Sequence, residues 1–250
     1  MQLHDTLTLN TFGNSSITSE KREKLIRSIF NRVAERYDLM NDLMSMGSHR
    51  LWKRKFCQQA GNASTGQVLV DLAGGTGDIA RALIDGQRKV FIIDPSIAMM
   101  RIAENRLGDR CHYLAAAAEN IPLPDNSIDL LTISFGIRNT TDISKSLQEI
   151  CRVLKPGGHF YCLEFSTPHA WLRPFYNTWS RIVIPRLGAL IAGHPDAYTY
   201  LIESIRKFPA QQEMADIIRQ AGFQNVSYSN LSFGIACIHR AQKIFKSQTV

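Results

Sequence analysis

The fold is decided by the stretch DLAGGTGD, Asp71–Asp78, which overlaps the end of the apolar run VLVDL at Val68–Leu72. Glycines at positions 74, 75 and 77 allow a tight turn and a close approach of the backbone to a ligand. The N–H groups at the start of the next helix would face the same ligand. The motif alone is weak, because Gly75-x-Gly77-x-x-Ala80 also fits the dinucleotide fingerprint and a plain strand–helix turn is the alternative.

From residue 67 onward, short β-branched runs alternate with helical segments. The helical pattern is clearest where Ile143, Leu147, Ile150 and Leu154 fall on one face, with Asp142 as the expected N-cap. Strands that alternate with helices indicate βαβ units and a parallel sheet. The predicted strands are 68–72, 90–94, 111–115, 128–134 and 159–165.

The C-terminal region ends the sheet differently. FQNVSYS, Phe223–Ser229, and FGIACIH, Phe233–His239, are separated by a very short turn, so they predict an antiparallel hairpin. Five βα units followed by a hairpin are the order of Rossmann-like class I methyltransferases and not of a dehydrogenase domain. We therefore predict an α/β fold with a seven-stranded, mostly parallel sheet that ends in an antiparallel hairpin.

Three further features indicate which ligand the glycine turn would hold. Asp94 ends the second strand, where a carboxylate accepts bonds from both hydroxyls of an adenosyl ribose. The small-residue loop AAAAENIPLPD, 115–125, can pass close to an adenine face, and LKPGG, 154–158, predicts a sharp turn into the fifth strand. Together with Asp71, Gly75 and Gly77, these features predict an S-adenosylmethionine site.

Composition and charge limit the partners and the cellular compartment that can be expected. The 250 residues carry a net charge of +7, which suits a partner with phosphates, either nucleic acid or an anionic membrane surface. No apolar run reaches the roughly 18 residues of a spanning helix, and the N-terminus has neither a secretory nor a mitochondrial targeting pattern. Five scattered cysteines without CxxC spacing predict no metal site and no disulfide framework, and hence a cytoplasmic protein.

Two parts of the chain are expected. Residues 1–65 are predicted to form a helical N-terminal extension or lid, and residues 66–250 a methyltransferase domain. The extension has an irregular first part followed by an apolar helical face, formed by Ile26, Ile29, Phe30, Val33 and Tyr37. An acid-free stretch between Glu164 and Asp196 predicts an insertion at about 166–205 on the substrate side.

Longer segments resemble one family in particular. They are YDLMNDLMSMGSHRLWK, AENIPLPDNSIDLLTISFGIRNTTD, LKPGGHFYCLEFSTP and YLIESIRKFPAQ. These segments are similar to the UbiE-type C-methyltransferases of ubiquinone and menaquinone biosynthesis, from about Ser28 to Phe245. The family usually has Asn or Asp where this chain has Ala117, so only backbone contact is expected there. The resemblance implies that S-adenosylmethionine contacts Thr76, Asp94, Ala117, Ala118 and Ser134.

The implied reaction transfers a methyl group to a ring carbon of 2-methoxy-6-polyprenyl-1,4-benzoquinol, of demethylmenaquinol, or of both. It requires alignment of the reacting atoms and removal of a proton from a neighbouring hydroxyl, but no metal. We expect Arg138 and Asn139 to be catalytic, with Arg138 as an oxyanion stabiliser or water-orienting group; a structural salt bridge is the alternative. His49 is expected to be a surface basic residue, with a role as the general base as the alternative. The candidate substrate contacts are Tyr37, Asp38, Asn41 and Gly136.

The polyprenyl quinol also implies partners, since its tail will not leave a bilayer unaided. We expect peripheral association with the anionic surface of the inner membrane through the insertion. Its aromatic and basic residues are Trp171, Arg173, Phe175, Trp179, Arg181 and Arg186. A quinone-biosynthesis protein complex and a homodimer are further expectations. No nucleic-acid partner is expected, because we find no stacking platform with interleaved basic residues. The alternatives are methylation of another small phenol or of RNA, and a non-catalytic S-adenosylmethionine-binding scaffold.

Overall fold

A computed structural model describes the chain continuously over residues 47–62, 68–179 and 195–244. It also describes separate positions nearer the N-terminus: 11–12, 15–16, 21, 24–26, 28, 41–42 and 45. Tyr37, Asp38, Arg181 and Arg186 therefore lie outside the described residues.

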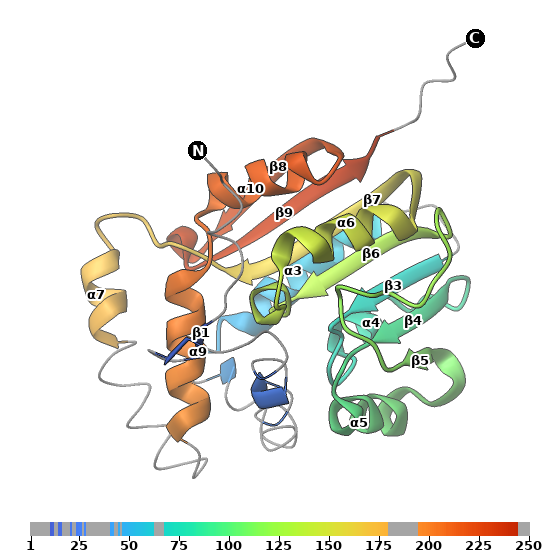
Figure 1. The fold of residues 1–250 in the computed structure, drawn as a ribbon, viewed down its shortest axis with the longest axis horizontal. Coiled ribbons are helices and arrows are strands. Elements are labelled where there is room, and N and C mark those ends of the chain that lie inside the picture. Colours follow the sequence, from blue (N-terminus) through green and yellow to red (C-terminus); the bar gives the residue numbers. More distant parts are fainter. Residues whose placement is uncertain are drawn as a thin grey trace.

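A seven-stranded sheet forms the centre of the molecule (Figure 1). The strand order is β5-β4-β3-β6-β7-β9-β8; the first five are mutually parallel, and β9 runs antiparallel to both of its neighbours. This topology confirms the predicted parallel sheet with a terminal hairpin. The strands are β3 (Val68–Leu72), β4 (Lys89–Ile93), β5 (His112–Leu114), β6 (Ile128–Ser134), β7 (Leu154–Phe165), β8 (Phe223–Leu231) and β9 (Ala236–Lys243).

One predicted strand begins earlier than its sequence pattern indicates. β7 starts at Leu154 instead of His159, and LKPGG is an irregularity inside the strand and not a turn before it. Leu154 pairs with Ile128 and His159 with Leu130, so four residues of β7 bulge opposite one of β6. Gly157 has φ +78°, a value that favours glycine and makes this bulge possible.

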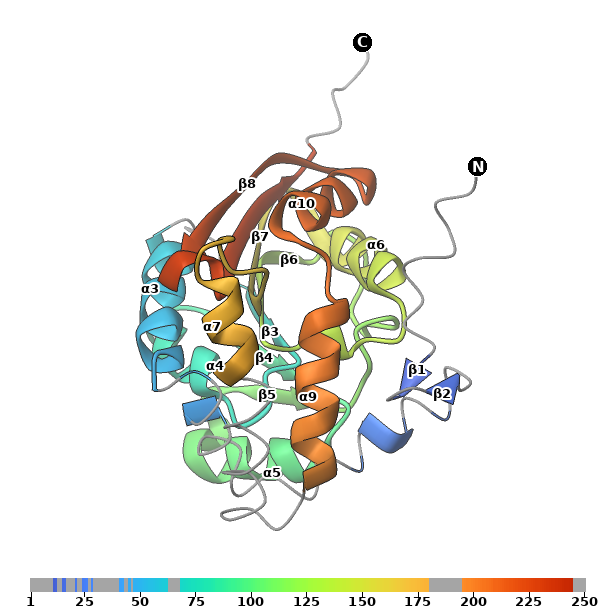
Figure 2. The ribbon, with the colours of Figure 1, turned by 90° about the vertical axis from the view of Figure 1, so that its left-hand side faces the viewer.

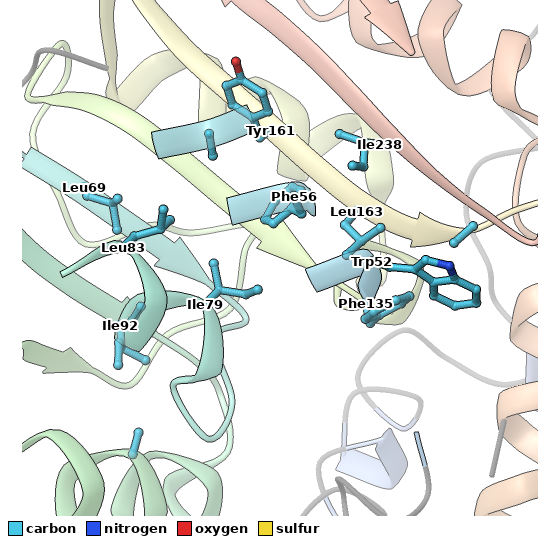
Figure 3. Packing of buried hydrophobic residues seen from close by; sticks show 14 of the residues in the cluster. Trp52, Phe56, Leu69, Ile79, Leu83, Ile92, Phe135, Tyr161, Leu163 and Ile238 are labelled. Atoms are coloured by element: carbon cyan, nitrogen blue, oxygen red, sulfur yellow. The ribbon is translucent and has the colours of Figure 1, made fainter. Parts of the chain in front are cut away.

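Helices cover both faces of the sheet. On one face lie α3 (His49–Asn62), α4 (Asp78–Leu83) and α5 (Ile97–Leu107), whose apolar side chains form one cluster with the sheet residues Leu69, Ile92 and Leu163 (Figure 3). On the other face lie α6 (Ile143–Val153) and α10 (Gln211–Gln220). Asp142 caps α6 as predicted, because its carboxylate accepts a bond from the Lys145 backbone N–H at 2.9 Å.

The described part of the N-terminal region is joined to the sheet. Trp52, Phe56 and Ala60 recur every four residues on α3 and are all buried against it. The Trp52 indole N–H also donates to Ser232 Oγ at 2.9 Å, in the turn between β8 and β9. Two short strands, β1 (Thr11–Phe12) and β2 (Ser15–Ser16), lie within the part expected to be irregular.

Two helices of the predicted insertion lie beside each other at one end of the sheet, α7 (Arg173–Thr178) and α9 (Pro195–Lys207) (Figures 1 and 2). α9 contacts the short turn Ile137–Asn139 that follows β6. No helix in the described ranges is both long and apolar enough to cross a membrane.

Candidate cofactor and active site

Two pockets meet at the carboxyl ends of the parallel strands. The larger pocket has a volume of about 800 Å³, and its wall includes Asp94, Met99, Ala117 and Asn139. The smaller pocket has a volume of about 330 Å³ and is lined by Lys53, Asp71, Ala73, Gly74, Gly75, Thr76, Asp78, Ile79 and Ser134. Ala73 and Gly75 line both, so the two pockets form one cleft. A cleft of this kind suits a small-molecule cofactor.

Asp94 lies at the end of β4 in the wall of the larger pocket. One carboxylate oxygen accepts the Gly75 N–H at 3.0 Å and the other accepts the Ser96 N–H at 2.7 Å. Burial raises the pKa of Asp94 to about 6, although the two hydrogen bonds act in the opposite direction. Each oxygen keeps a second acceptor site, so the carboxylate can bind the two hydroxyls of a ribose, as predicted from its strand-end position.

Asp71 lies at the end of β3 in the wall of the smaller pocket and is 1% exposed. Its carboxylate accepts bonds from the Thr132 hydroxyl and from the Ala80 N–H, both at 3.1 Å. Burial raises the pKa of Asp71 to about 7. An ammonium group in the smaller pocket would favour its ionised form.

The three glycines of the turn differ in what surrounds them. A Cβ on Gly74 would lie 2.9 Å from the Asp71 carbonyl and carboxylate oxygens. Gly77 has φ +79°, and a Cβ there would lie 2.9 Å from Leu107 in α5, so this residue serves helix packing and lines neither pocket. Beside Gly75, by contrast, the space is open, which leaves its backbone accessible to a ligand. Thr76 lines the smaller pocket.

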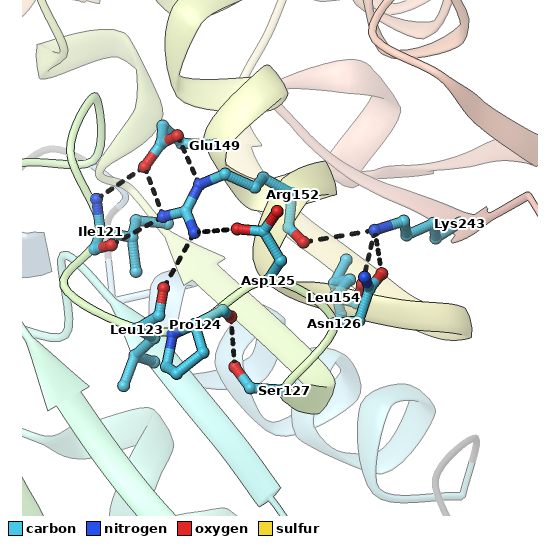
Figure 4. A network of polar contacts seen from close by, with 10 residues as sticks. All are labelled: Ile121, Leu123, Pro124, Asp125, Asn126, Ser127, Glu149, Arg152, Leu154 and Lys243. Atoms are coloured by element: carbon cyan, nitrogen blue, oxygen red, sulfur yellow. Dashed lines mark hydrogen bonds and ion pairs between the residues drawn. The ribbon is translucent and has the colours of Figure 1, made fainter.

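The small-residue loop forms another wall of the larger pocket, with Ala117 and Ala118 in the lining. Glu119 fixes this loop to the start of α6, since one carboxylate oxygen accepts the Thr141 N–H, the Thr141 hydroxyl and the Asp142 N–H at 2.5–3.2 Å. Arg152 holds the following segment through the Ile121 and Leu123 carbonyls at 2.8 and 2.9 Å (Figure 4). The second half of the loop, from Glu119 onward, is therefore held in place.

Ser134 and its neighbours turn the chain away from β6 at the junction of the two pockets. The Ser134 hydroxyl lines the smaller pocket, and it is buried without a hydrogen-bond partner among the described residues. Phe135 has φ +55°, a strained value for a non-glycine residue. A Cβ on Gly136 would lie 2.5 Å from Ala73 Cβ, so the close approach of β6 and β3 requires glycine here.

The two predicted catalytic residues follow directly, but only Asn139 lines the pocket. Arg138 is 1% exposed, and its Nη1 donates to Glu164 at 2.5 Å and to the Phe135 carbonyl at 2.9 Å. The structure therefore contains the salt bridge that the alternative interpretation requires, with Glu164 as the partner of Arg138. Asn139 Nδ2 donates to the same Phe135 carbonyl at 3.4 Å, and its Oδ1 accepts the Tyr200 hydroxyl at 3.2 Å.

The N-terminal candidates differ in position. Asn41 is buried but lines neither pocket, and its carbonyl accepts the Ser45 hydroxyl at 2.7 Å. The expectation of a surface His49 is wrong: it is 2% exposed, and its Nε2 lies 3.0 Å from the Asp42 carboxylate. Its backbone N–H donates to Ser45 Oγ at 3.0 Å, so Asp42 and Ser45, which both precede α3, are partners of His49.

Lys53 and Glu119 are site residues that the sequence motifs did not single out. Glu119 could have been found, because it lies inside the predicted loop 115–125. Lys53 ends the family segment 37–53, but the segment gives it no role, since only the tertiary packing of α3 brings it to the glycine turn.

The buried Ser134 hydroxyl, the open backbone at Gly75 and the two strand-end carboxylates fit S-adenosylmethionine. Fold and site define an S-adenosylmethionine-dependent methyltransferase with a Rossmann-like fold. A phosphoethanolamine N-methyltransferase from Haemonchus contortus, solved with S-adenosylmethionine, matches 77% of this chain and 52% of its own, with a TM-score of 0.60 and 17% identity. A methyltransferase from Thermotoga maritima matches 86% of this chain and 99% of its own, with a TM-score of 0.61 and 22% identity.

The particular family follows from sequence comparison. The model of the ubiE/COQ5 methyltransferase family matches residues 17–243, and the chain belongs to that family. A relative from Rubrivivax gelatinosus, the ubiquinone/menaquinone biosynthesis C-methyltransferase UbiE, is 56% identical over 229 residues, which are 92% of this chain and 91% of the relative. The predicted family and cofactor are thereby confirmed.

Proposed function

We propose that this enzyme methylates a ring carbon of a polyprenyl quinol in ubiquinone or menaquinone biosynthesis. The substrates would be 2-methoxy-6-polyprenyl-1,4-benzoquinol, demethylmenaquinol, or both. The observation that carries the proposal is the 56% identity, over nearly the full length of both chains, to a relative with that name.

When bound, S-adenosylmethionine supplies a methyl group on a sulfonium, which is already a good leaving system. Asp94 would hold the ribose, Asp71 with Thr76 and Ser134 the amino-acid end, and the Ala117–Ala118 backbone the adenine. The remaining task is to bring the ring carbon into line and to remove the proton of a neighbouring hydroxyl. Gly136 and Asn139, in the wall of the larger pocket, stand where a substrate ring would meet the cofactor.

Arg138 and Asn139 are the proposed pair, with Asn139 in contact with the substrate and Arg138 in a positioning role. The Asn139 amide would bind the ring hydroxyl or a water on it. The Arg138 guanidinium lies behind the pocket wall and is paired with Glu164, so it would act by holding the strained Phe135, and with it Asn139, through the Phe135 carbonyl. A guanidinium is in any case a poor general base.

The test is methylation of both quinols by the purified enzyme with labelled S-adenosylmethionine. Arg138→Lys should reduce turnover by roughly a hundredfold while cofactor affinity stays nearly unchanged, since lysine lacks the planar fork. A variant that unfolds, or that loses cofactor binding in proportion to rate, would favour a purely structural ion pair. If wild type methylates another phenol or RNA and neither quinol, the substrate assignment fails.

We also propose that the enzyme docks peripherally on an anionic membrane. Three large side chains form an exposed aromatic patch: Trp171, Phe175 and Phe233 are 59%, 72% and 60% exposed. The Trp171 and Phe233 rings meet edge to face at 5.2 Å, which joins the insertion to the β8–β9 turn. Exposed aromatic residues next to basic ones suit a lipid interface.

Vesicle flotation tests this docking. Wild type should float with anionic vesicles at low salt, and Phe175→Ser/Phe233→Ser should remain in solution while it still binds S-adenosylmethionine. Flotation of both proteins alike, or of neither, contradicts the role of the patch. If the same double variant instead converts a dimer to a monomer, the aromatic patch is a homodimer interface; loss of a copurifying quinone-biosynthesis protein would indicate a complex.

A further inference from the structure

Lys53 reaches the smaller pocket from α3, outside every motif of the methyltransferase domain. Its side chain is 15% exposed, and Nζ donates to Asp78 Oδ2 at 3.0 Å. Among the described residues that line this pocket, Lys53 is the one cationic side chain. The other charged residues in the lining are Asp71 and Asp78.

The amino-acid end of S-adenosylmethionine carries two opposite charges, an ammonium and a carboxylate. Buried Asp71 and the orphaned Ser134 hydroxyl suit the ammonium. The carboxylate needs a donor, preferably a cationic one, because charge-assisted hydrogen bonds are the stronger ones. We propose that Lys53 binds the carboxylate of S-adenosylmethionine, so that α3 completes the cofactor site.

The charges around Lys53 support this assignment. Its ammonium donates to the Asp78 carboxylate. Asp78 also pairs with Arg106 at 3.5 Å, so two cations share one carboxylate. Burial by itself would raise the pKa of Asp78, but Lys53 and then Arg106 and Arg81 hold it below its ordinary value. Three cations, Lys53, Arg81 and Arg106, therefore surround the two carboxylates Asp71 and Asp78 at this corner of the cleft.

The adjoining groove continues this positive surface. Its lining includes five lysine and arginine residues, together with His49, and a single acid, Asp78. The five are Arg50, Lys53, Arg54, Arg81 and Arg106. A carboxylate that reaches the border between the groove and the smaller pocket thus enters a region of positive potential.

The competing interpretation is that Lys53 only joins α3 to the start of α4 through Asp78. Calorimetry with S-adenosylmethionine and with decarboxylated S-adenosylmethionine, which keeps the ammonium, separates the two. Wild type should bind the complete cofactor roughly tenfold more tightly or better. Lys53→Gln should bring the two affinities within about twofold of each other, by weakening only the complete cofactor.

Two controls complete the test. Lys55→Gln, on the same helix and exposed, should keep the wild-type ratio of the two affinities. Asp78→Asn removes the ion pair but leaves Lys53, so we expect S-adenosylmethionine affinity to be kept or raised. If Lys53→Gln and Asp78→Asn instead each weaken both ligands by the same factor, Lys53 is only a structural anchor and the inference is overturned.

The ratio of affinities does not depend on the fraction of folded protein, so a destabilised variant still gives an answer. Equal binding of both ligands by wild type would overturn the inference without any variant. The inference concerns only the cofactor: failure to methylate a quinol would leave these measurements unchanged, and failure to bind either ligand would contradict the cofactor itself.

Discussion

The two halves of the cofactor cleft differ in the side chains that form them. The larger pocket combines small and apolar residues, such as Leu72, Met99 and Ala116, with a single strand-end carboxylate that we assign to the ribose. The smaller pocket gathers Lys53, Asp71 and Asp78 around a glycine turn. Burial of apolar surface should therefore dominate ligand affinity in the larger pocket, and electrostatic interactions should dominate it in the smaller pocket. 5′-Methylthioadenosine, which keeps the adenosine but lacks the amino-acid end, allows the two halves to be measured separately.

The largest effect is expected in the larger pocket. Asp94→Ala should cost roughly 2–3 kcal/mol of affinity, because a buried charged acceptor is lost. The loss should be equal for S-adenosylmethionine and 5′-methylthioadenosine, since both carry the ribose. Calorimetry with the two ligands, and with NAD as a negative control, measures it. A loss confined to S-adenosylmethionine would place Asp94 in the wrong half of the cleft.

A smaller effect is expected at the glycine turn. Gly74→Ala places a methyl group 2.9 Å from two Asp71 oxygens. Such overpacking lowers the free energy of unfolding by about 1–3 kcal/mol. The displaced carboxylate should weaken S-adenosylmethionine more than 5′-methylthioadenosine. Gly61→Ala in α3 is the control, because the added methyl meets only Leu83 at 3.7 Å. Equal weakening of both ligands would show that the turn does not act through Asp71.

The pH dependence of ligand affinity should also differ between the two halves of the cleft. Ligand binding requires both carboxylates ionised, with pKa values of about 6 for Asp94 and about 7 for Asp71. Between pH 8 and pH 6, 5′-methylthioadenosine should lose roughly twofold in affinity and S-adenosylmethionine roughly a further tenfold. Asp71→Asn should remove this extra dependence. An identical pH profile for both ligands in wild type would contradict the assignment of the ammonium to Asp71.

The cofactor-free chain should show the opposite trend in stability. Both carboxyls have folded-state pKa values above the ordinary 3.8. Their contribution to stability is therefore complete below about pH 4 and is lost as the pH rises through 6 and 7. Thermal unfolding with and without S-adenosylmethionine at pH 5 and pH 8 should show the cofactor stabilising the chain more at pH 8.

The smallest expected effect is an increase in ligand affinity. Ala117→Asn introduces the side chain that the family resemblance implies at this position of the adenine loop. One additional hydrogen bond should increase affinity by about 1 kcal/mol, equally for the two ligands. Ala115→Asn, in the same loop but absent from the pocket lining, should leave affinity unchanged. Tighter binding of S-adenosylmethionine alone would mean that the loop contacts the amino-acid end.

The sequence predicted those parts of the site that lie at strand ends. Asp94, Ala117 and Ser134 all follow parallel strands, and the carboxyl ends of such strands meet at one edge. The capping of α6 by Asp142 was equally accessible, because a cap depends on three or four consecutive residues. Local patterns suffice for such features.

What sequence could not predict depends on contacts between distant elements. Glu164, the partner of Arg138, is on the neighbouring strand β7, 26 positions later. Lys53 meets Asp78, 25 positions later, only when α3 packs beside α4. Gly77 fits the ligand-binding motif, yet its missing side chain accommodates α5. Spacing along the chain carries no information about such contacts.

The position of the last strand has a consequence for biosynthesis. β9, Ala236–Lys243, lies between β7 and β8 and not at the edge of the sheet. A nascent chain that ends before it leaves the long strand β7 with an unpaired edge, open to pairing with another molecule. The Trp52–Ser232 bond, which joins residues 180 positions apart, also forms late. The core therefore closes only after β9 has left the ribosome, and until then the nascent enzyme depends on protection from aggregation.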